Sequence, residues 1–184
     1  MLPWSVDFAG RLEQTTYTSE LLRGNPLGDP HERPVLVYLP PGYDESEDRY
    51  PSIYVTMGYT GHVGMWFNRV PFRQPYPELL DAMFQDENVP RAVVVFVDSW
   101  TRYGGSQCLD SPGTGQYQSY LCDEIVPWVD ATYRTIPDRD HRAARQAGVP
   151  DGRLHFELFE GTHGGIEYRY PMAVRWLAEQ LRAN

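Results

Sequence analysis

The sequence contains no lysine, and all 16 of its basic residues are arginines. This absence excludes chemistry that needs a lysine, such as a Schiff base or the lysine of a phosphate-binding loop. Acidic residues number 25, which gives a formal net charge of −9. Nucleic acids and anionic membranes attract basic surfaces, so we expect no nucleic-acid partner and no membrane partner.

Cysteines and long apolar runs are also scarce. Cys108 and Cys122 are too few for a disulfide framework, and their spacing fits no metal-ligand pattern, so we expect free thiols or one bridge and no metal. No stretch approaches the roughly 18 apolar residues of a membrane span. The first ten residues contain no basic segment followed by an apolar run, so we expect no secretory signal and a cytoplasmic location.

Aromatic residues are abundant, with 5 Trp, 13 Tyr and 7 Phe among 184 residues. A chain of this length buries about 70% of its unfolded surface without cross-links. The sequence shows no internal repeat and no linker. We therefore expect residues 1–184 to form a single domain.

Four apolar runs that end at Pro, Gly or acidic residues have the composition of β-strands. These runs are Val35–Leu39, Ser52–Met57, Ala92–Val97 and Leu154–Phe159. The run Ala92–Val97 is apolar throughout, which is typical of a strand covered on both faces. Residues Thr15–Thr18 are predicted to lie in an edge strand.

Three segments have helical periodicity, and they lie between and after these runs. They are Glu78–Phe84, Tyr117–Tyr133 with a kink at Pro127, and Met172–Leu181. Strands that alternate with helices predict an α/β fold with a mainly parallel sheet flanked by helices.

Ligands of open α/β sheets bind at the carboxyl ends of the strands, and three predicted strands end in glycine-rich segments. The segment Gly58–Gly64 is suited to present backbone N–H groups to an oxyanion. A second segment, Asp98–Ser106, follows the third strand. His163 lies between glycines after the last strand and is a candidate general base, whereas His62 is predicted to be an ordinary surface histidine.

Four motifs occur in the order seen in a known family. They are Tyr38–Tyr43, Tyr54–Gly61, Gly104–Cys108 with Ser111–Gly115, and Gly161–Gly165. Together they resemble the putative-esterase branch of the α/β-hydrolases, which includes esterase D, enterochelin esterase and the mycolyltransferases. The resemblance implies a serine hydrolase that acts on carboxylic esters through an acyl-enzyme, without a cofactor.

The resemblance also implies roles for individual residues. His163 corresponds to the catalytic histidine, and the backbone at Gly58 and Tyr59 corresponds to the oxyanion loop. Trp100, Tyr103 and Ser106 are expected to contact a small-molecule ester substrate. Homo-oligomerisation stays open.

One family feature is missing, because no serine stands in the Gly-x-Ser-x-Gly frame that forms the nucleophile elbow. Ser106 and Cys108 are weak substitutes, since nothing around them supplies the strained turn or a low thiol pKa. We place an apparent deletion near Ala143–Ala144, where about 100 residues of strands and helices are expected.

Either the protein lacks this segment, or the sequence joins two stretches of a longer protein. A true deletion predicts either that the last strand pairs directly with Ser52–Met57, or that two apolar strand edges stay open to aggregation. The alternatives to an esterase are a catalytically inactive, shortened domain that binds a partner or has a structural role, and an acyltransferase, which differs only in the acceptor it uses.

Overall fold

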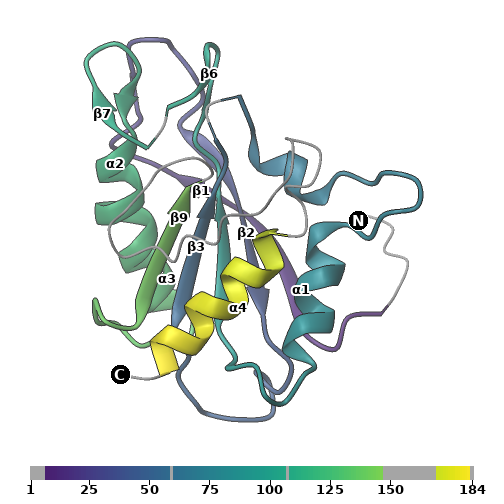
Figure 1. Cartoon of the computed structure of the whole chain (residues 1–184). Helices are drawn as coiled ribbons and strands as arrows, with labels where there is room; N and C mark the ends of the chain where they lie inside the picture. The colour runs from purple at the N-terminus through teal and green to yellow at the C-terminus, as the bar shows by residue number, and fades with distance from the viewer. Residues whose placement is uncertain (1–6, 59, 107, 147–168, 183–184) are drawn as a thin grey trace.

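The computed structural model describes residues 7–58, 60–106, 108–146 and 169–182. Its centre is a five-stranded sheet in the order β1-β2-β4-β3-β9. The strands are β1 (Arg11–Thr18), β2 (Glu32–Leu39), β3 (Ser52–Thr56), β4 (Val93–Val97) and β9 (Arg142–Gln146). Figure 1 shows the sheet with helices in front of it and behind it.

The sheet is mixed, so the expectation of a mainly parallel sheet is wrong. β1 pairs antiparallel with β2 and β2 pairs antiparallel with β4, whereas β3 is parallel to both β4 and β9. The helix α1 (Tyr76–Phe84) connects β3 to β4, as is usual for parallel neighbours. No helix separates β1 from β2, and these two neighbours therefore run in opposite directions.

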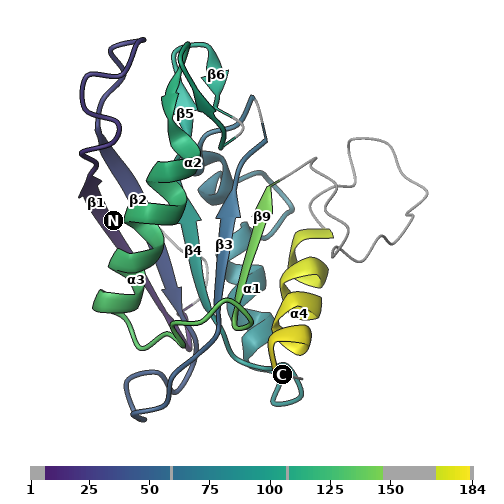
Figure 2. The same cartoon turned by 90° about the vertical axis from the view of Figure 1, so that its left-hand side faces the viewer.

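Two core clusters lie on opposite faces of the sheet. Val94 and Phe96 of β4 pack in the cluster that includes α1 and α4 (Arg169–Arg182). Val93, Val95 and Val97 pack in the cluster on the other face. β4 is therefore covered on both faces, as its continuous apolar sequence predicted, and Figure 2 shows the helices on the two sides.

The second face is covered by one continuous but irregular helical stretch. It consists of α2 (Tyr117–Ser119), the π-helical η2 (Tyr120–Ile125) and α3 (Val126–Thr132). Pro127 lies in the first turn of α3 and has no N–H to donate to the preceding turn, which fits a change of helix type at this point. The predicted helix is thus confirmed, with a π-helical segment directly before the proline.

The remaining elements are short. They are the 3₁₀ helix η1 (Val63–Phe67) and two small hairpins, β5 (Trp100–Thr101) with β6 (Gly104–Gly105), and β7 (Asp110–Ser111) with β8 (Gly115–Gln116). No helix in the part of the chain that the structure describes is long and apolar enough to cross a bilayer.

β9 crosses the position of the apparent deletion. Ala143 and Ala144 are consecutive members of this strand and align with Ile53 and Tyr54 of β3. A strand next to β3 was expected, but from the segment 154–159, which lies outside the described residues. The single-domain assignment and the deletion itself stay predictions.

Candidate active site

The carboxyl ends of β3 and β4 lie at one end of the molecule, to which the arrowheads of both strands point in Figure 2. β3 ends at Thr56, and a turn follows in which the Gly61 N–H donates to the Gly58 carbonyl at 2.9 Å. A Cβ atom on Gly61 would lie 2.5 Å from Cε of Met57. It would also lie 2.9 Å from Cβ of Met57, so a larger residue at position 61 would require this part of the loop to shift.

His62 caps the 3₁₀ helix η1 that follows the turn. Its Nδ1 accepts a hydrogen bond from the Gly64 N–H at 3.2 Å, and its carbonyl accepts from the Met65 N–H at 3.0 Å. An Nδ1 that accepts leaves the proton of a neutral imidazole on Nε2. The side chain is exposed, as predicted, and its free edge carries a hydrogen-bond donor.

Asp98 follows β4 directly, and its side chain is buried rather than solvated. Its Oδ1 accepts from the Val63 N–H at 3.3 Å, and its Oδ2 accepts from Nη1 of Arg33 at 3.1 Å. Both members of this ion pair are almost inaccessible, with 5% and 6% of their side-chain surfaces exposed. Asp98 thus joins two segments of the chain. One is the loop that follows β3 (residues 57–65, called the β3 loop below), and the other is the start of β2.

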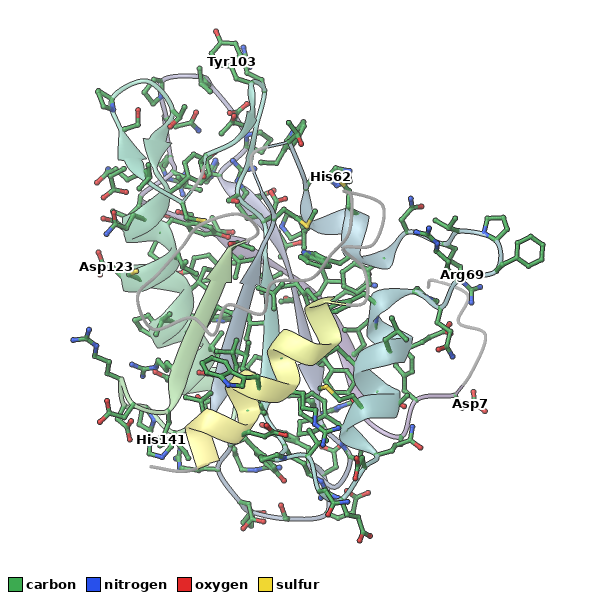
Figure 3. All side chains as sticks on the ribbon, in the orientation of Figure 1. Asp7, His62, Arg69, Tyr103, Asp123 and His141 are labelled. Atoms are coloured by element: carbon green, nitrogen blue, oxygen red, sulfur yellow. The ribbon has the colours of Figure 1, made fainter. Side chains whose placement is uncertain are left out.

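Trp100 and Tyr103 lie on the β5–β6 hairpin. Trp100 is 37% exposed, and its ring makes an edge-on contact with His62, with centroids 5.8 Å apart. Tyr103 lies between the two strands of the hairpin and is 67% exposed. Figure 3 labels His62 and Tyr103 at the same end of the molecule, with His141 at the opposite end. The structure therefore brings Trp100 to the β3 loop.

Ser106 is buried, and its Oγ accepts a hydrogen bond from the Cys108 N–H at 3.2 Å. Burial raises the pKa of the Cys108 thiol, although hydrogen bonds from Ser99 and Thr56 act in the opposite direction. The thiol is therefore protonated near neutral pH, which agrees with the absence of any local signal for a reactive cysteine.

Two of the predicted site residues, Tyr59 and His163, lie outside the described residues. Gly58 is described, and it lies in the turn at the carboxyl end of β3. In the described part of the chain no group of three or more His, Cys, Asp or Glu side chains is placed to hold a metal ion.

Two buried residues next to this site, Arg33 and Tyr117, were not among the predicted site residues. Nη2 of Arg33 donates to the Tyr117 hydroxyl, which donates to the Trp100 carbonyl at 3.3 Å. The burial of Arg33 could have been predicted from the alternation of side chains along β2. Positions 33, 35 and 37 lie on one face of the strand, and Val35 and Val37 are core residues. Tyr117 has no such signal, since buried helical tyrosines are common.

Comparison with known proteins identifies relatives that are longer than this chain. A relative named endo-1,4-beta-xylanase/feruloyl esterase, from Xylanibacter ruminicola, is 22% identical over 187 aligned positions, which cover 91% of this chain and 24% of that protein. Among solved structures, a ferulic acid esterase superposes with a TM-score of 0.58 at 23% identity, covering 76% of this chain and 51% of that one. An S-formylglutathione hydrolase from Agrobacterium tumefaciens has a TM-score of 0.54 at 18% identity, with coverages of 79% and 51%.

These solved structures show the fold, and the chain spans about half of their length. The family assignment comes from a family model described as "Putative esterase", which matches residues 29–145. The matched region extends from the approach to β2 into β9 and contains the turn after β3, Asp98 and the Trp100 hairpin. Since this region is more than half of the sequence, the chain belongs to the putative-esterase family.

Proposed function

We propose that this chain is part of a carboxylic ester hydrolase that acts on esters of aromatic acids. The observation that carries the proposal is the family match over residues 29–145, which includes the glycine-rich turn at the carboxyl end of β3. This is the end of the sheet at which α/β folds bind their ligands.

The family resemblance supports an oxyanion role for the first residues of the β3 loop. Gly58 and Tyr59 correspond to the oxyanion loop of the family, and we assign their backbone N–H groups to a developing oxyanion on that ground. Backbone N–H groups in such a position stabilise the tetrahedral intermediate of acyl transfer. Further along the loop, the N–H groups of Gly61, Val63, Gly64 and Met65 donate within the protein.

An aromatic acyl group is supported by the residues beside this loop. Trp100 is partly exposed and lies against His62, and Tyr103 extends from the same hairpin. Aromatic side chains favour stacked or edge-on contacts with an aromatic ligand. Two of the solved relatives with TM-scores of 0.58 and 0.51 are named ferulic acid esterases.

Hydrolysis by this family requires a serine in a nucleophile elbow, and the sequence contains no Gly-x-Ser-x-Gly motif. The serine oxygen would attack the ester carbonyl while His163 takes its proton and passes it to the leaving alcohol, and water would then release the acid. Ser106 lacks the glycine frame of the elbow, and its Oγ is buried and accepts a hydrogen bond from the Cys108 N–H, so we do not assign it this role. The complete enzyme therefore needs a segment near Ala143–Ala144.

An inactive, shortened domain is the second candidate function. The observation that favours it is β9, which occupies the edge of β3 with consecutive residues on both sides of the apparent deletion. A chain with this arrangement keeps the β3 loop and the Trp100 hairpin, and it would bind an aromatic ligand without hydrolysing an ester.

Intact-mass measurement of the natural protein and an ester assay separate the two candidates. A mass well above 21.2 kDa, with hydrolysis of methyl ferulate that is lost in His163→Ala, supports the esterase. A mass of 21.2 kDa with no hydrolysis of methyl ferulate or p-nitrophenyl acetate supports the inactive domain. Activity that survives His163→Ala contradicts the proposed mechanism.

A further inference from the structure

A closed circuit of contacts joins the β3 loop to the Trp100 hairpin. Asp98 accepts hydrogen bonds from the Val63 N–H and from Arg33. Arg33 donates to the Tyr117 hydroxyl, and Tyr117 donates to the Trp100 carbonyl. The Trp100 ring in turn contacts His62, the residue before Val63, and this contact near the surface completes the circuit.

The elements of this circuit come from distant parts of the sequence. Arg33 and Asp98 are 65 residues apart, and Arg33 and Tyr117 are 84 residues apart. They meet because β2 runs antiparallel to β4, so that the start of β2 lies beside the carboxyl end of β4. The circuit therefore exists only in the folded sheet, at the edge that carries the site.

A gain in stability does not explain why this circuit contains the buried ion pair Arg33–Asp98. A buried ion pair loses hydration free energy that its attraction only partly recovers, and apolar residues of similar size are often as stable. Arg33 adds a further unfavourable contribution, since its buried Nε has no hydrogen-bond partner among the residues that the structure describes. What the polar pair provides, and an apolar pair would not, is directional bonds to both loops.

We propose that the Arg33–Asp98 pair, together with the Tyr117 hydroxyl, positions the β3 loop and Trp100 relative to each other and thereby sets the selectivity for aromatic esters. The inference rests on the proposed function. Arg33, Asp98 and Tyr117 act through Val63 and Trp100, so they are positioning residues and not catalytic residues.

Tyr117→Phe tests this coupling with a small change. The ring of Tyr117 is fully buried and stays in place, while the link from Arg33 to the Trp100 carbonyl is lost. Tyr133→Phe is the matched control, because Tyr133 belongs to the same core cluster but its hydroxyl donates to Glu13 in β1.

The first measurement is amide hydrogen exchange, which needs no enzymatic activity. Tyr117→Phe is expected to accelerate exchange at Val63 by about fivefold, the effect of one lost hydrogen bond, and to leave the amides of α1 unchanged. Tyr133→Phe is expected to leave Val63 unchanged. No acceleration at Val63, or an equal acceleration at Val63 and in α1, would overturn the proposal.

The second measurement is the ratio of kcat/KM for methyl ferulate to that for p-nitrophenyl acetate, made on the complete protein. Tyr117→Phe is expected to lower this ratio about fivefold, and Tyr133→Phe to leave it unchanged. An unchanged ratio in Tyr117→Phe overturns the selectivity role.

Failure of the proposed function is distinguishable from failure of this inference. If the wild-type protein hydrolyses neither ester, the esterase proposal fails, and the coupling is judged by exchange at Val63 and by calorimetric binding of ferulate. Should Tyr117→Phe fail to fold, Asp98→Asn serves in the same measurements, because it removes the ion pair but keeps an oxygen acceptor for Val63. Unchanged exchange and unchanged ferulate binding in that variant also overturn the inference.

Discussion

The carboxylate of Asp81 in α1 accepts a hydrogen bond from the Tyr38 hydroxyl of β2 at 2.8 Å. The same buried carboxylate accepts from the N–H groups of Ala9 and Gly10 and from the Gln85 side chain. A single side chain thus attaches the segment before β1 to a helix about 70 residues later.

We expect Asp81→Ala to lower the free energy of unfolding by about 3 kcal/mol, because it leaves the buried Tyr38 hydroxyl and three partly buried donors without their acceptor. Urea denaturation measures this change. Glu87→Ala removes an exposed acid close in sequence and is expected to stay within about 0.5 kcal/mol of wild type. Equal effects of the two substitutions would contradict the anchoring role of Asp81.

The turn Val70–Arg73 places Phe72 in a conformation that favours glycine. The Arg73 N–H donates to the Val70 carbonyl at 3.2 Å, and Phe72 has φ +67° with its ring fully exposed. Phe72→Gly is therefore expected to raise the free energy of unfolding by roughly 0.5–1 kcal/mol, since it relieves strain and removes no buried contact. Phe72→Ala keeps the strain and is expected to be nearly neutral. A gain in Phe72→Ala that equals the gain in Phe72→Gly would show that strain is not the cause.

Because the chain has no lysine, its buried tyrosines contribute strongly to the loss of stability at alkaline pH. Burial raises the pKa of Tyr54 and that of Tyr117 to about 12 each, above the usual value of 10. Between pH 10 and 12 the unfolded chain loses these protons while the folded protein keeps them, so stability falls as pH rises. Each such tyrosine contributes a slope of about 1.4 kcal/mol per pH unit in that range.

Tyr54→Phe isolates this effect. The slope of unfolding free energy against pH above pH 10 is expected to decrease by about 1.4 kcal/mol per pH unit in the variant. Urea denaturation at pH 8, 10 and 11 measures it. An identical slope in the two proteins would mean that Tyr54 ionises equally in the folded and unfolded states.

Cys108 is expected to react slowly with iodoacetamide at pH 7.5. Its raised pKa lowers the fraction of reactive thiolate at that pH below the fraction in the unfolded chain. Mass spectrometry of the labelled protein, with and without urea, measures the two rates. Faster labelling of Cys108 in the folded protein would identify an activated thiol, contrary to this prediction.

Strands with continuous β-branched and apolar residues were predictable from the sequence. β3 and β4 match the predicted runs to within one residue. Both strands are buried on both faces, so each can be identified from its own sequence without knowledge of the strand it pairs with. β9 was not predictable, since Arg142–Gln146 contains no β-branched residue. It is a strand because β3 offers unpaired backbone groups along its other edge.

The candidate site, too, has features that the sequence predicts and features that it does not. The glycines after β3 and the position of Trp100 after β4 were predicted from local sequence, since turns and strand ends depend on nearby residues. The contact between His62 and Trp100 was not, because it joins two loops that are adjacent only in the sheet.

The sequence by itself determined the acidic, lysine-free character of the chain, its main strands and helices, and the family motifs. The tertiary structure decided that the sheet is mixed and that Arg33 meets Asp98. Local sequence cannot specify this contact, because Arg33 and Asp98 are 65 residues apart in the chain. The antiparallel pairing of Val35 with Val97 brings Nη1 of Arg33 to 3.1 Å from Oδ2 of Asp98.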